Sequence, residues 1–233
     1  MSARARVALV GAGGRMGRLA RGLLEQSADF ELAAAIERGD DLSAALRASG
    51  AELGLDFTVA GLGAEHGFAM IACAVRPVIG TSGVSLEQND ALDRAARAKG
   101  LGGLVVPNFS LGVWLLVEAA ERAARFYARA EIVEMHHADK LDAPSGTALY
   151  TAERMAAARG TQPAAIPIHS VRLPGLYSNQ EVMLGGPGEL LRLRHETYSP
   201  ACFSPGILAA LRYARGATGV GRGIGLAFEA AGE

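Results

Sequence analysis

The chain has 233 residues, half of them apolar, and its 23 basic and 24 acidic side chains leave a net charge of −1 at pH 7. This composition is typical of a folded globular protein with one large or two small domains. The near-neutral charge argues against nucleic acid as the main partner, because nucleic-acid-binding proteins carry a strongly basic face. No apolar run approaches the roughly 18 residues of a membrane span, so no membrane segment is expected.

The two cysteines, Cys73 and Cys202, lie far apart in apolar or small-residue surroundings. We expect free thiols in a reducing compartment, with a single disulfide as the alternative. The apolar run at residues 7–10 is too short for a signal peptide and passes at once into glycines and Arg15. These features predict a cytoplasmic location.

A strand is predicted at residues 7–10, followed by a glycine-rich turn and a stretch with helical apolar spacing. This order is the context of a dinucleotide-binding fingerprint, in which a pyrophosphate lies on the helix N-terminus. The spacing departs from G-x-G-x-x-G, because Met16 replaces the third glycine and Gly17 follows it. A purely structural turn is the alternative. The candidate cofactor residues here are Gly11, Ala12, Gly13, Gly14, Arg15 and Met16.

A second predicted strand, residues 31–38, carries Glu37 at its end, twenty residues after Gly17. An acidic side chain at this place can accept hydrogen bonds from an adenosine ribose, while neighbouring Arg38 can pair with a 2′-phosphate. Both are candidate cofactor residues, and two solvated charges at a strand end are the alternative. Because the two side chains favour different cofactors, the choice between NADH and NADPH stays open.

Strands and helices continue to alternate, with strands expected at residues 53–58, 77–79 and 104–106 and helices at 40–49, 67–75 and 85–99. Such alternation predicts an α/β fold, a Rossmann-type doubly wound parallel sheet, whose ligands bind at the carboxyl ends of the strands. Six more candidate cofactor residues follow two of these strands: Gly80, Thr81, Ser82, Pro107, Asn108 and Phe109.

From Ser110 onward the pattern changes. A long helix at residues 111–127, a strand at 131–137 and a helix at 145–159 precede strands at 168–173, 180–184 and 190–195. This order predicts a second, α+β domain with a mixed sheet. Ser204 and Pro205 then begin a last helix, and we expect the glycine-rich residues 216–225 to be irregular packing at the chain end.

The segment at residues 134–148, EMHHADKLDAPSGTA, gathers groups that can transfer protons. Successive side chains of a strand point to opposite faces, so His136 and His137 cannot do the same job. A histidine can deliver a proton near neutral pH, and Lys140 can also donate one, which arginine cannot. Lys140 is one of only two lysines among the basic residues, which indicates a specific requirement. Asp139 and Asp142 either hold Lys140 charged or are solvated loop acids.

The helix predicted to start at Ser145 can bind an anion, because Ser145, Gly146 and Thr147 offer helix N–H groups and two hydroxyls. These three are candidate substrate-binding residues, although an ordinary N-cap explains them equally well. A zinc site at the two histidines lacks the usual ligand geometry and a nearby cysteine, so no metal is expected. A serine hydrolase would need a G-x-S-x-G elbow.

Six motifs, taken together, resemble the dihydrodipicolinate reductase family of bacterial lysine and diaminopimelate synthesis, also called 4-hydroxy-tetrahydrodipicolinate reductases. The motifs extend over nearly the whole chain, and the segment at residues 134–148 is highly specific. They are residues 10–17, 56–58, 79–83, 107–110, 134–148 and 170–175, the last followed by residues 180–182.

The resemblance implies NADH- or NADPH-dependent reduction of 4-hydroxy-tetrahydrodipicolinate to tetrahydrodipicolinate with loss of water. It implies a dinucleotide-binding domain at residues 1–109 and 204–233, and an inserted substrate-binding and oligomerisation domain at residues 110–203. The implied partners are a small dicarboxylate substrate and three further copies in a homotetramer. The implied site residues are His136 as proton donor, Lys140 as a second donor, and His137, Gly146 and Thr147 as substrate ligands.

Three features depart from the family pattern: the chain is short between Arg38 and Leu55, Val59 follows the D-F-T motif, and Pro200 replaces a substrate-binding arginine. The last implies weaker substrate affinity, a substitute such as Arg194, or a changed substrate. The alternative function is therefore a related NAD(P)H-dependent reductase of a different cyclic imine or keto acid. A nucleotide-binding regulatory relative is a third hypothesis, against which His136 and Lys140 argue.

Overall fold

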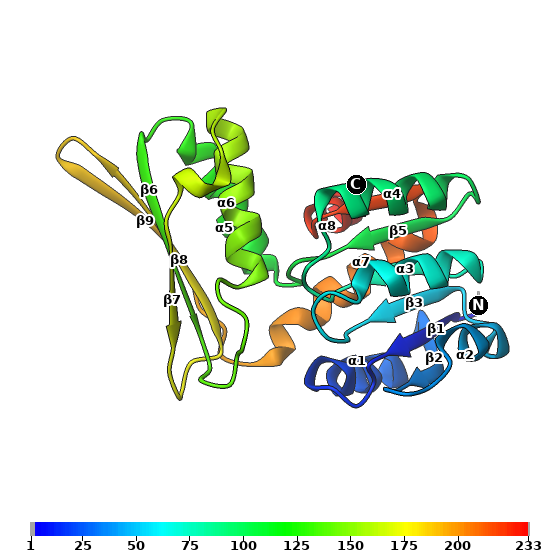
Figure 1. Cartoon of the computed structure of the whole chain (residues 1–233). Coiled ribbons are helices and arrows are strands. Elements are labelled where there is room, and N and C mark those ends of the chain that lie inside the picture. Colours follow the sequence, from blue (N-terminus) through cyan, green and yellow to red (C-terminus); the bar gives the residue numbers. More distant parts are fainter. Residues whose placement is uncertain (1–2, 233) are drawn as a thin grey trace. The chain divides into compact units, whose positions relative to one another are not determined.

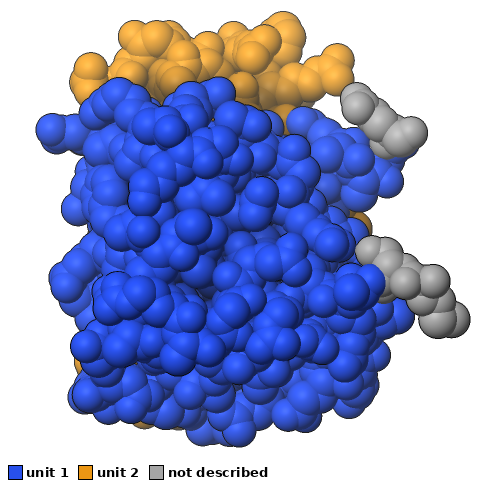
Figure 2. All heavy atoms as spheres, turned by 90° about the vertical axis from the view of Figure 1, so that its right-hand side faces the viewer, with its two compact units in different colours: residues 1–109, 203–233 blue, residues 110–202 orange. Residues whose placement is uncertain are grey.

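The computed structural model describes residues 3–232 of the chain (Figure 1). It forms two compact units: unit 1 comprises residues 1–109 and 203–233, and unit 2 comprises residues 110–202 (Figure 2). The first two residues and residue 233 of the expected dinucleotide-binding domain lie outside the described range. Within this range no helix is long and apolar enough to cross a membrane.

Unit 1 is built on a six-stranded parallel sheet in the order β10–β5–β4–β3–β1–β2. The inner strands β3 and β5 are buried throughout, as strands covered on both faces must be. The predicted Rossmann-type sheet is confirmed. Its strands are β1 (Ala5–Val10), β2 (Phe30–Ile36), β3 (Leu53–Asp56), β4 (Arg76–Ile79), β5 (Gly102–Val105) and β10 (Gly219–Arg222).

Helices cover this sheet on both faces (Figure 1). They are α1 (Arg15–Gln26), α2 (Leu42–Ser49), α3 (Gly63–Ala72), α4 (Leu86–Arg97) and α7 (Ser204–Gly216), and α8 (Gly225–Gly232) packs on α7. The helix predicted over residues 67–75 begins earlier, at Gly63. Its glycines let it lie close to β4, since a Cβ at Gly67 would lie 2.7 Å from Ile79. Glycine weakens helical propensity and so concealed this helix start.

Within the glycine-rich tail, which was not assigned to any strand from the sequence, residues 219–222 form the edge strand β10 beside β5. Gly219 has φ +88°, and any Cβ there would collide with Asp93 of α4. The Asp93 carboxylate accepts a hydrogen bond of 2.8 Å from the backbone N–H of Val220. Glycine is therefore needed where α4 approaches the strand, and this need removed the β-branched pattern of an ordinary strand.

Unit 2 has the predicted mixed sheet, with four strands in the order β7–β6–β8–β9. Helices α5 (Leu111–Ala124) and α6 (Gly146–Arg159) pack on one face, where Ala130 and Ile132 of β6 share a core with Val182 and Leu184 of β8. We call the opposite side the open face. The strands are β6 (Arg129–His136), β7 (Ile168–Arg172), β8 (Ser178–Gly186) and β9 (Glu189–His195), with 3₁₀ turns η1 (Pro163–Ala165) and η2 (Pro200–Phe203).

Candidate active site

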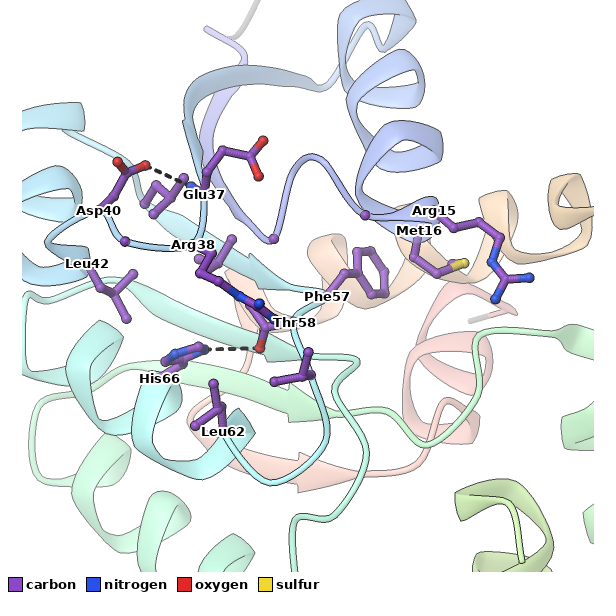
Figure 3. Close-up of a pocket in the computed structure, with 16 residues that line it drawn as sticks. Arg15, Met16, Glu37, Arg38, Asp40, Leu42, Phe57, Thr58, Leu62 and His66 are labelled. Carbon is purple, nitrogen blue, oxygen red and sulfur yellow. Dashed lines mark hydrogen bonds between the residues drawn. The ribbon is translucent and has the colours of Figure 1, made fainter. Parts of the chain in front are cut away.

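A pocket of about 570 Å³ lies at the carboxyl ends of β1, β2 and β3 in unit 1 (Figure 3). This is the edge at which nucleotides bind to doubly wound sheets. In Figure 3, Glu37 and Arg38 leave the end of β2 in different directions. The predicted cofactor residues that line the pocket are Gly11, Gly14, Arg15, Met16, Glu37 and Arg38.

The glycine-rich turn is tight because three backbone segments meet there. Gly11 has φ +79°, and a Cβ on it would lie 2.6 Å from the carbonyl oxygen of Phe57. A Cβ on Gly17 would collide with the carbonyl oxygen of Gly11. Gly17 thus provides the close packing of α1 on the turn that a third fingerprint glycine usually provides, one residue late. Helix α1 starts at Arg15 without a side-chain cap, an end that favours a phosphate.

Ala12 and Gly13 belong to the same turn but do not line the pocket. The remaining six predicted cofactor residues follow β4 and β5 and do not line it either. Gly80 leaves room for the packed rings of Phe57 and Phe109, whose centroids are 5.3 Å apart. A Cβ at residue 80 would lie 2.5 Å from the Phe57 ring. Thr81 is buried, and its hydroxyl donates a 2.9 Å hydrogen bond to Asp56. The Thr81 side chain is thus engaged within the protein. Ser82, Pro107 and Asn108 lie at the same strand ends.

A buried carboxylate–histidine pair beside the pocket was not assigned a role from the sequence. Asp56, with 0% exposure, accepts hydrogen bonds from the Thr58 backbone N–H at 2.8 Å and from Nδ1 of His66 at 3.1 Å. The hydrogen bond to Asp56 is the main cause of a raised pKa for His66, which burial opposes. His66 lines the pocket. The only sequence signal was an aspartate in an otherwise apolar strand, which must find donors when buried.

In unit 2, β6 places Glu134 and His136 on the helix-covered face, where both are buried. Nδ1 of His136 lies 2.5 Å from Oε2 of Glu134, and its Nε2 lies 3.2 Å from the hydroxyl of Ser178, its cross-strand partner on β8. His137 follows the end of β6 and is partly exposed. The two histidines therefore have different surroundings.

Glu134 accepts hydrogen bonds from further donors. Nη1 and Nη2 of Arg172, at the end of β7, each lie 2.8 Å from one carboxylate oxygen, and the backbone N–H of Ser145 lies 3.2 Å from Oε1. Burial alone would raise the pKa of Glu134, but hydrogen bonds from His136, Arg172 and Ser170 outweigh it and lower the pKa to about 2. Neither Glu134 nor Arg172 was a predicted site residue.

Lys140 lies on the loop between β6 and α6, with its ammonium 2.7 and 2.8 Å from the two carboxylate oxygens of Asp142. Burial would raise the pKa of Asp142, but the hydrogen bond from Lys140 outweighs burial, and the pKa is lowered. Arg172 also donates to the backbone carbonyls of Asp142 at 2.7 Å and Lys140 at 3.3 Å. Asp139, by contrast, is 99% exposed. Of the two acids, Asp142 is the one that holds Lys140.

The start of α6 lies beside this cluster. Ser145 is buried, and its hydroxyl caps the helix by accepting a 3.2 Å hydrogen bond from the Ala148 N–H. Gly146 and Thr147 form the first turn and are partly exposed. The ordinary N-cap is therefore present at Ser145, while its role as a substrate ligand stays a prediction.

The segment in which Pro200 replaces the expected arginine begins η2. Arg194 cannot take that arginine's place on the His136 side of its own sheet. The pairing of Glu181 with Arg194 and of Gln180 with His195 puts Arg194 on the open face, where it pairs with Glu181 at 3.5 Å. Among the described residues no group of three or more histidines, cysteines and acids could hold a metal.

Two family models match most of the chain. The model described as dihydrodipicolinate reductase, N-terminus, matches residues 5–109, and the model described as dihydrodipicolinate reductase, C-terminus, matches residues 112–223.

Curated relatives carry one name. The 4-hydroxy-tetrahydrodipicolinate reductase of Moorella thermoacetica is 41% identical to this chain, over 96% of the chain and 98% of the relative. The protein of the same name from Legionella pneumophila (strain Lens) is 42% identical, over 89% of the chain and 92% of the relative.

Solved structures agree. The dihydrodipicolinate reductase of Paenisporosarcina sp. TG-14, solved with dipicolinate bound, is 31% identical with a TM-score of 0.79, over 95% of this chain and 98% of that one. GenD2 from gentamicin A biosynthesis, solved with NAD, is 13% identical with a TM-score of 0.60, over 91% of this chain and 85% of that one, and shows a similar fold only.

Proposed function

The chain belongs to the dihydrodipicolinate reductase family, and from this membership we propose how its own residues carry out the reaction. It is an NAD(P)H-dependent oxidoreductase that reduces 4-hydroxy-tetrahydrodipicolinate in lysine and diaminopimelate biosynthesis. No comparison favours the alternative substrate raised by Pro200.

The glycine-rich turn of unit 1 fits a dinucleotide. A Cβ at Gly13 would lie 2.8 Å from a Glu37 carboxylate oxygen, so a larger residue at position 13 would displace the Glu37 side chain from its present place. We assign the pyrophosphate to residues 11–16 and the adenosine ribose to Glu37 and Arg38. Residues 80–82 and 107–109 serve the nicotinamide half at the neighbouring strand ends. When bound, NADH or NADPH supplies the hydride; Glu37 favours the free ribose hydroxyls of NADH and Arg38 the 2′-phosphate of NADPH.

His136 is the proton donor in this proposal. The substrate loses water to give a conjugated imine, and hydride reduction of that imine is completed by one proton. The observation that supports His136 is that its Nδ1 is held by Glu134, 2.5 Å away, which leaves Nε2 as the nitrogen that exchanges a proton. Lys140, with its ammonium held by Asp142, is the second donor.

The substrate carboxylates bind at the start of α6. Helix N-terminal N–H groups and the helix dipole favour an anion, and the partly exposed Gly146 and Thr147 form that first turn. The Glu134 carboxylate joins this turn to His136, because it accepts hydrogen bonds from both Ser145 and His136. His137, which is partly exposed, is the remaining predicted substrate ligand.

The protein is a homotetramer and cytoplasmic in this proposal. Support for assembly comes from the open face of unit 2, whose partly exposed apolar side chains lie among charged ones. The apolar ones are Val133, Met135, Val171 and Met183, and the charged ones are Glu131, Glu181, Arg192 and Arg194. Sedimentation equilibrium tests the assembly: four chains per particle support it, and a monomeric mass at micromolar concentration contradicts it.

Two substitutions test the roles in unit 2. His136→Gln is expected to lower kcat by about 100-fold, the usual contribution of a general acid, with unchanged KM. Thr147→Val is expected to raise KM and to leave kcat within a few-fold, because it removes a hydrogen bond to a charged group. Cofactor affinity, measured by fluorescence titration, should match the wild type in both. Full kcat in His136→Gln would exclude His136 as the donor.

A further inference from the structure

We propose that Glu134 and Arg172 are positioning residues: together they fix which nitrogen of His136 carries the proton and where the Lys140 loop lies. This inference rests on the proposed function, because it takes His136 and Lys140 as the proton donors. It assigns a task to a buried acid and a partly buried base for which the proposed reaction itself gives no role.

Glu134 is ionised in spite of its burial. Its side chain has 0% exposure, although the same face of β6 otherwise presents Ala130 and Ile132 to the core. A carboxylate in such a place persists only when cations and donors surround it. Five groups do so: two Arg172 nitrogens, the Ser145 N–H, Nδ1 of His136 and the Ser170 side chain. Arg172 supplies a permanent positive charge that helps to keep Glu134 ionised. Burial raises the pKa of Glu134, but the hydrogen bonds from His136, Arg172 and Ser170 together lower it to about 2.

The ionised Glu134 selects one tautomer of His136. An ionised carboxylate only accepts hydrogen bonds, so the ring nitrogen beside Glu134 must carry the hydrogen. That nitrogen is Nδ1. Nε2, beside the hydroxyl of Ser178, is then the nitrogen that takes up and releases the catalytic proton. Without Glu134 either nitrogen can carry the hydrogen, and part of the protein has the proton on the wrong side.

Arg172 also holds the loop between β6 and α6 that carries Lys140. Arg172 donates to the backbone carbonyls of Lys140 and Asp142 while both its terminal nitrogens hold Glu134. The same guanidinium therefore ties the loop that carries the second donor to the carboxylate that orients the first. A flexible loop would have to be ordered at each turnover, whereas this one is ordered beforehand.

A purely structural ion pair between β6 and β7 is the competing explanation. It predicts that loss of the charge lowers the stability of the fold but leaves the His136 tautomer unchanged. The positioning role predicts that loss of the charge also changes the tautomer. Glu134→Gln keeps the size and removes the charge, while Glu134→Asp keeps the charge and removes one methylene. The His136 tautomer in Glu134→Gln, read together with activity, separates the two explanations.

Glutamine also makes a specific prediction for the tautomer. The neighbours of Oε1, Nη2 of Arg172 and the Ser145 N–H, can only donate, so the amide oxygen of glutamine belongs at that position and its NH₂ group at the position of Oε2. There the NH₂ group lies beside Nδ1 of His136, which can accept if its hydrogen moves to Nε2; the Ser170 hydroxyl is the other partner of Glu134 that can accept. We therefore expect Glu134→Gln to turn its NH₂ toward His136 and to switch that ring to the Nε2–H form.

The experiment combines kinetics with ¹⁵N NMR of protein labelled at its five histidines, in which His136→Gln identifies the His136 signals. We expect Glu134→Gln to lower kcat about 100-fold and to show the Nε2–H tautomer, and Glu134→Asp to retain at least tenfold more activity than Glu134→Gln. The matched control is Glu131→Gln, on the same strand but on the open face, where the carboxylate lies 2.8 Å from His169. It should keep kcat within twofold.

Two results would overturn the proposal: an unchanged His136 tautomer in Glu134→Gln, or higher activity in Glu134→Gln than in Glu134→Asp. If the tautomer switches while both Glu134→Gln and His136→Gln keep full kcat, Glu134 orients the ring but the proposed role of His136 is wrong. Should Glu134→Gln fail to fold, Arg172→Lys tests the loop: we expect a lower kcat with cofactor affinity unchanged, and an unchanged kcat would contradict the role of Arg172.

Discussion

Each unit contains a buried carboxylate in contact with Nδ1 of a histidine, and the two pairs differ in their third partner. Asp56 of unit 1 bonds to His66, and its other donors are neutral: the Thr58 N–H and the Thr81 hydroxyl. Glu134 of unit 2 bonds to His136 and, through two nitrogens, to an arginine.

This difference decides what each histidine can do. Among the described residues, the hydrogen-bonded cluster around Asp56 contains no arginine or lysine, and the pKa of His66 is raised, chiefly by its hydrogen bond to Asp56. Beside Glu134 the charge is balanced by Arg172, so the imidazole need not carry charge there, as the proton transfer we propose for His136 requires. The cation beside the carboxylate, more than the carboxylate–histidine contact, therefore decides whether the histidine must carry charge.

The largest effect is expected from removing the arginine. Arg172→Met leaves Glu134 buried without its cation and should lower the free energy of unfolding by about 3–5 kcal/mol, as breaking a buried ion pair does. Urea denaturation followed by circular dichroism measures it. The control Arg154→Met should cost about 1 kcal/mol or less, because its partners Glu118 and Glu121 stay partly hydrated. Equal losses in the two variants would remove the distinction drawn for Glu134.

The next effect concerns the lysine that Arg172 helps to place. Lys140→Arg should lower kcat about 100-fold, because a guanidinium holds its proton too tightly to donate it. The other lysine provides the control: Lys99 bonds to the carbonyls of Ile71 and Ala72 in unit 1, and Lys99→Arg should leave kcat unchanged. Steady-state kinetics with saturating cofactor measure kcat of both variants. Full kcat in Lys140→Arg would show that position 140 needs only a positive charge and no transferable proton.

A smaller effect is expected at the departure from the family pattern. Pro200→Arg returns a cation to η2 and should lower KM about tenfold with little change in kcat, since a hydrogen bond to a charged group is worth roughly 1.5–3 kcal/mol. The measurement is KM for 4-hydroxy-tetrahydrodipicolinate. An unchanged KM would indicate that the substrate carboxylate is bound by other residues of this chain.

The smallest effect tests the pair in unit 1 through pH. Because the pKa of His66 is raised above its ordinary 6.5, the protonated ring stabilises the fold fully below pH 6.5, and this stabilisation is lost as pH rises through the folded-state value. His66→Gln should therefore be less stable than the wild type at pH 6, with the difference shrinking toward pH 9. Thermal melts across this range measure it, and a difference that grows with pH would contradict the charged anchor.

The sequence predicted most of the fold because periodicity and glycine turns are local signals. Examples of such elements are the strand, turn and helix around Gly11, and the strand end and helix start within residues 134–148. It could not predict the partners of Glu134, because Arg172 lies 38 residues away and meets it only through the pairing of β6 with β7. His66 was missed for a similar reason, since its contact with Asp56 depends on where α3 begins. Local patterns located the elements, whereas the sites depend on register.

The most direct test of the account is turnover by the wild-type protein. 4-Hydroxy-tetrahydrodipicolinate would be generated in situ by the synthase that precedes this step, and cofactor oxidation followed by absorbance with NADH and NADPH in turn. The account predicts one cofactor oxidised per substrate consumed. Folded protein that binds the cofactor by fluorescence titration yet oxidises neither cofactor would contradict it.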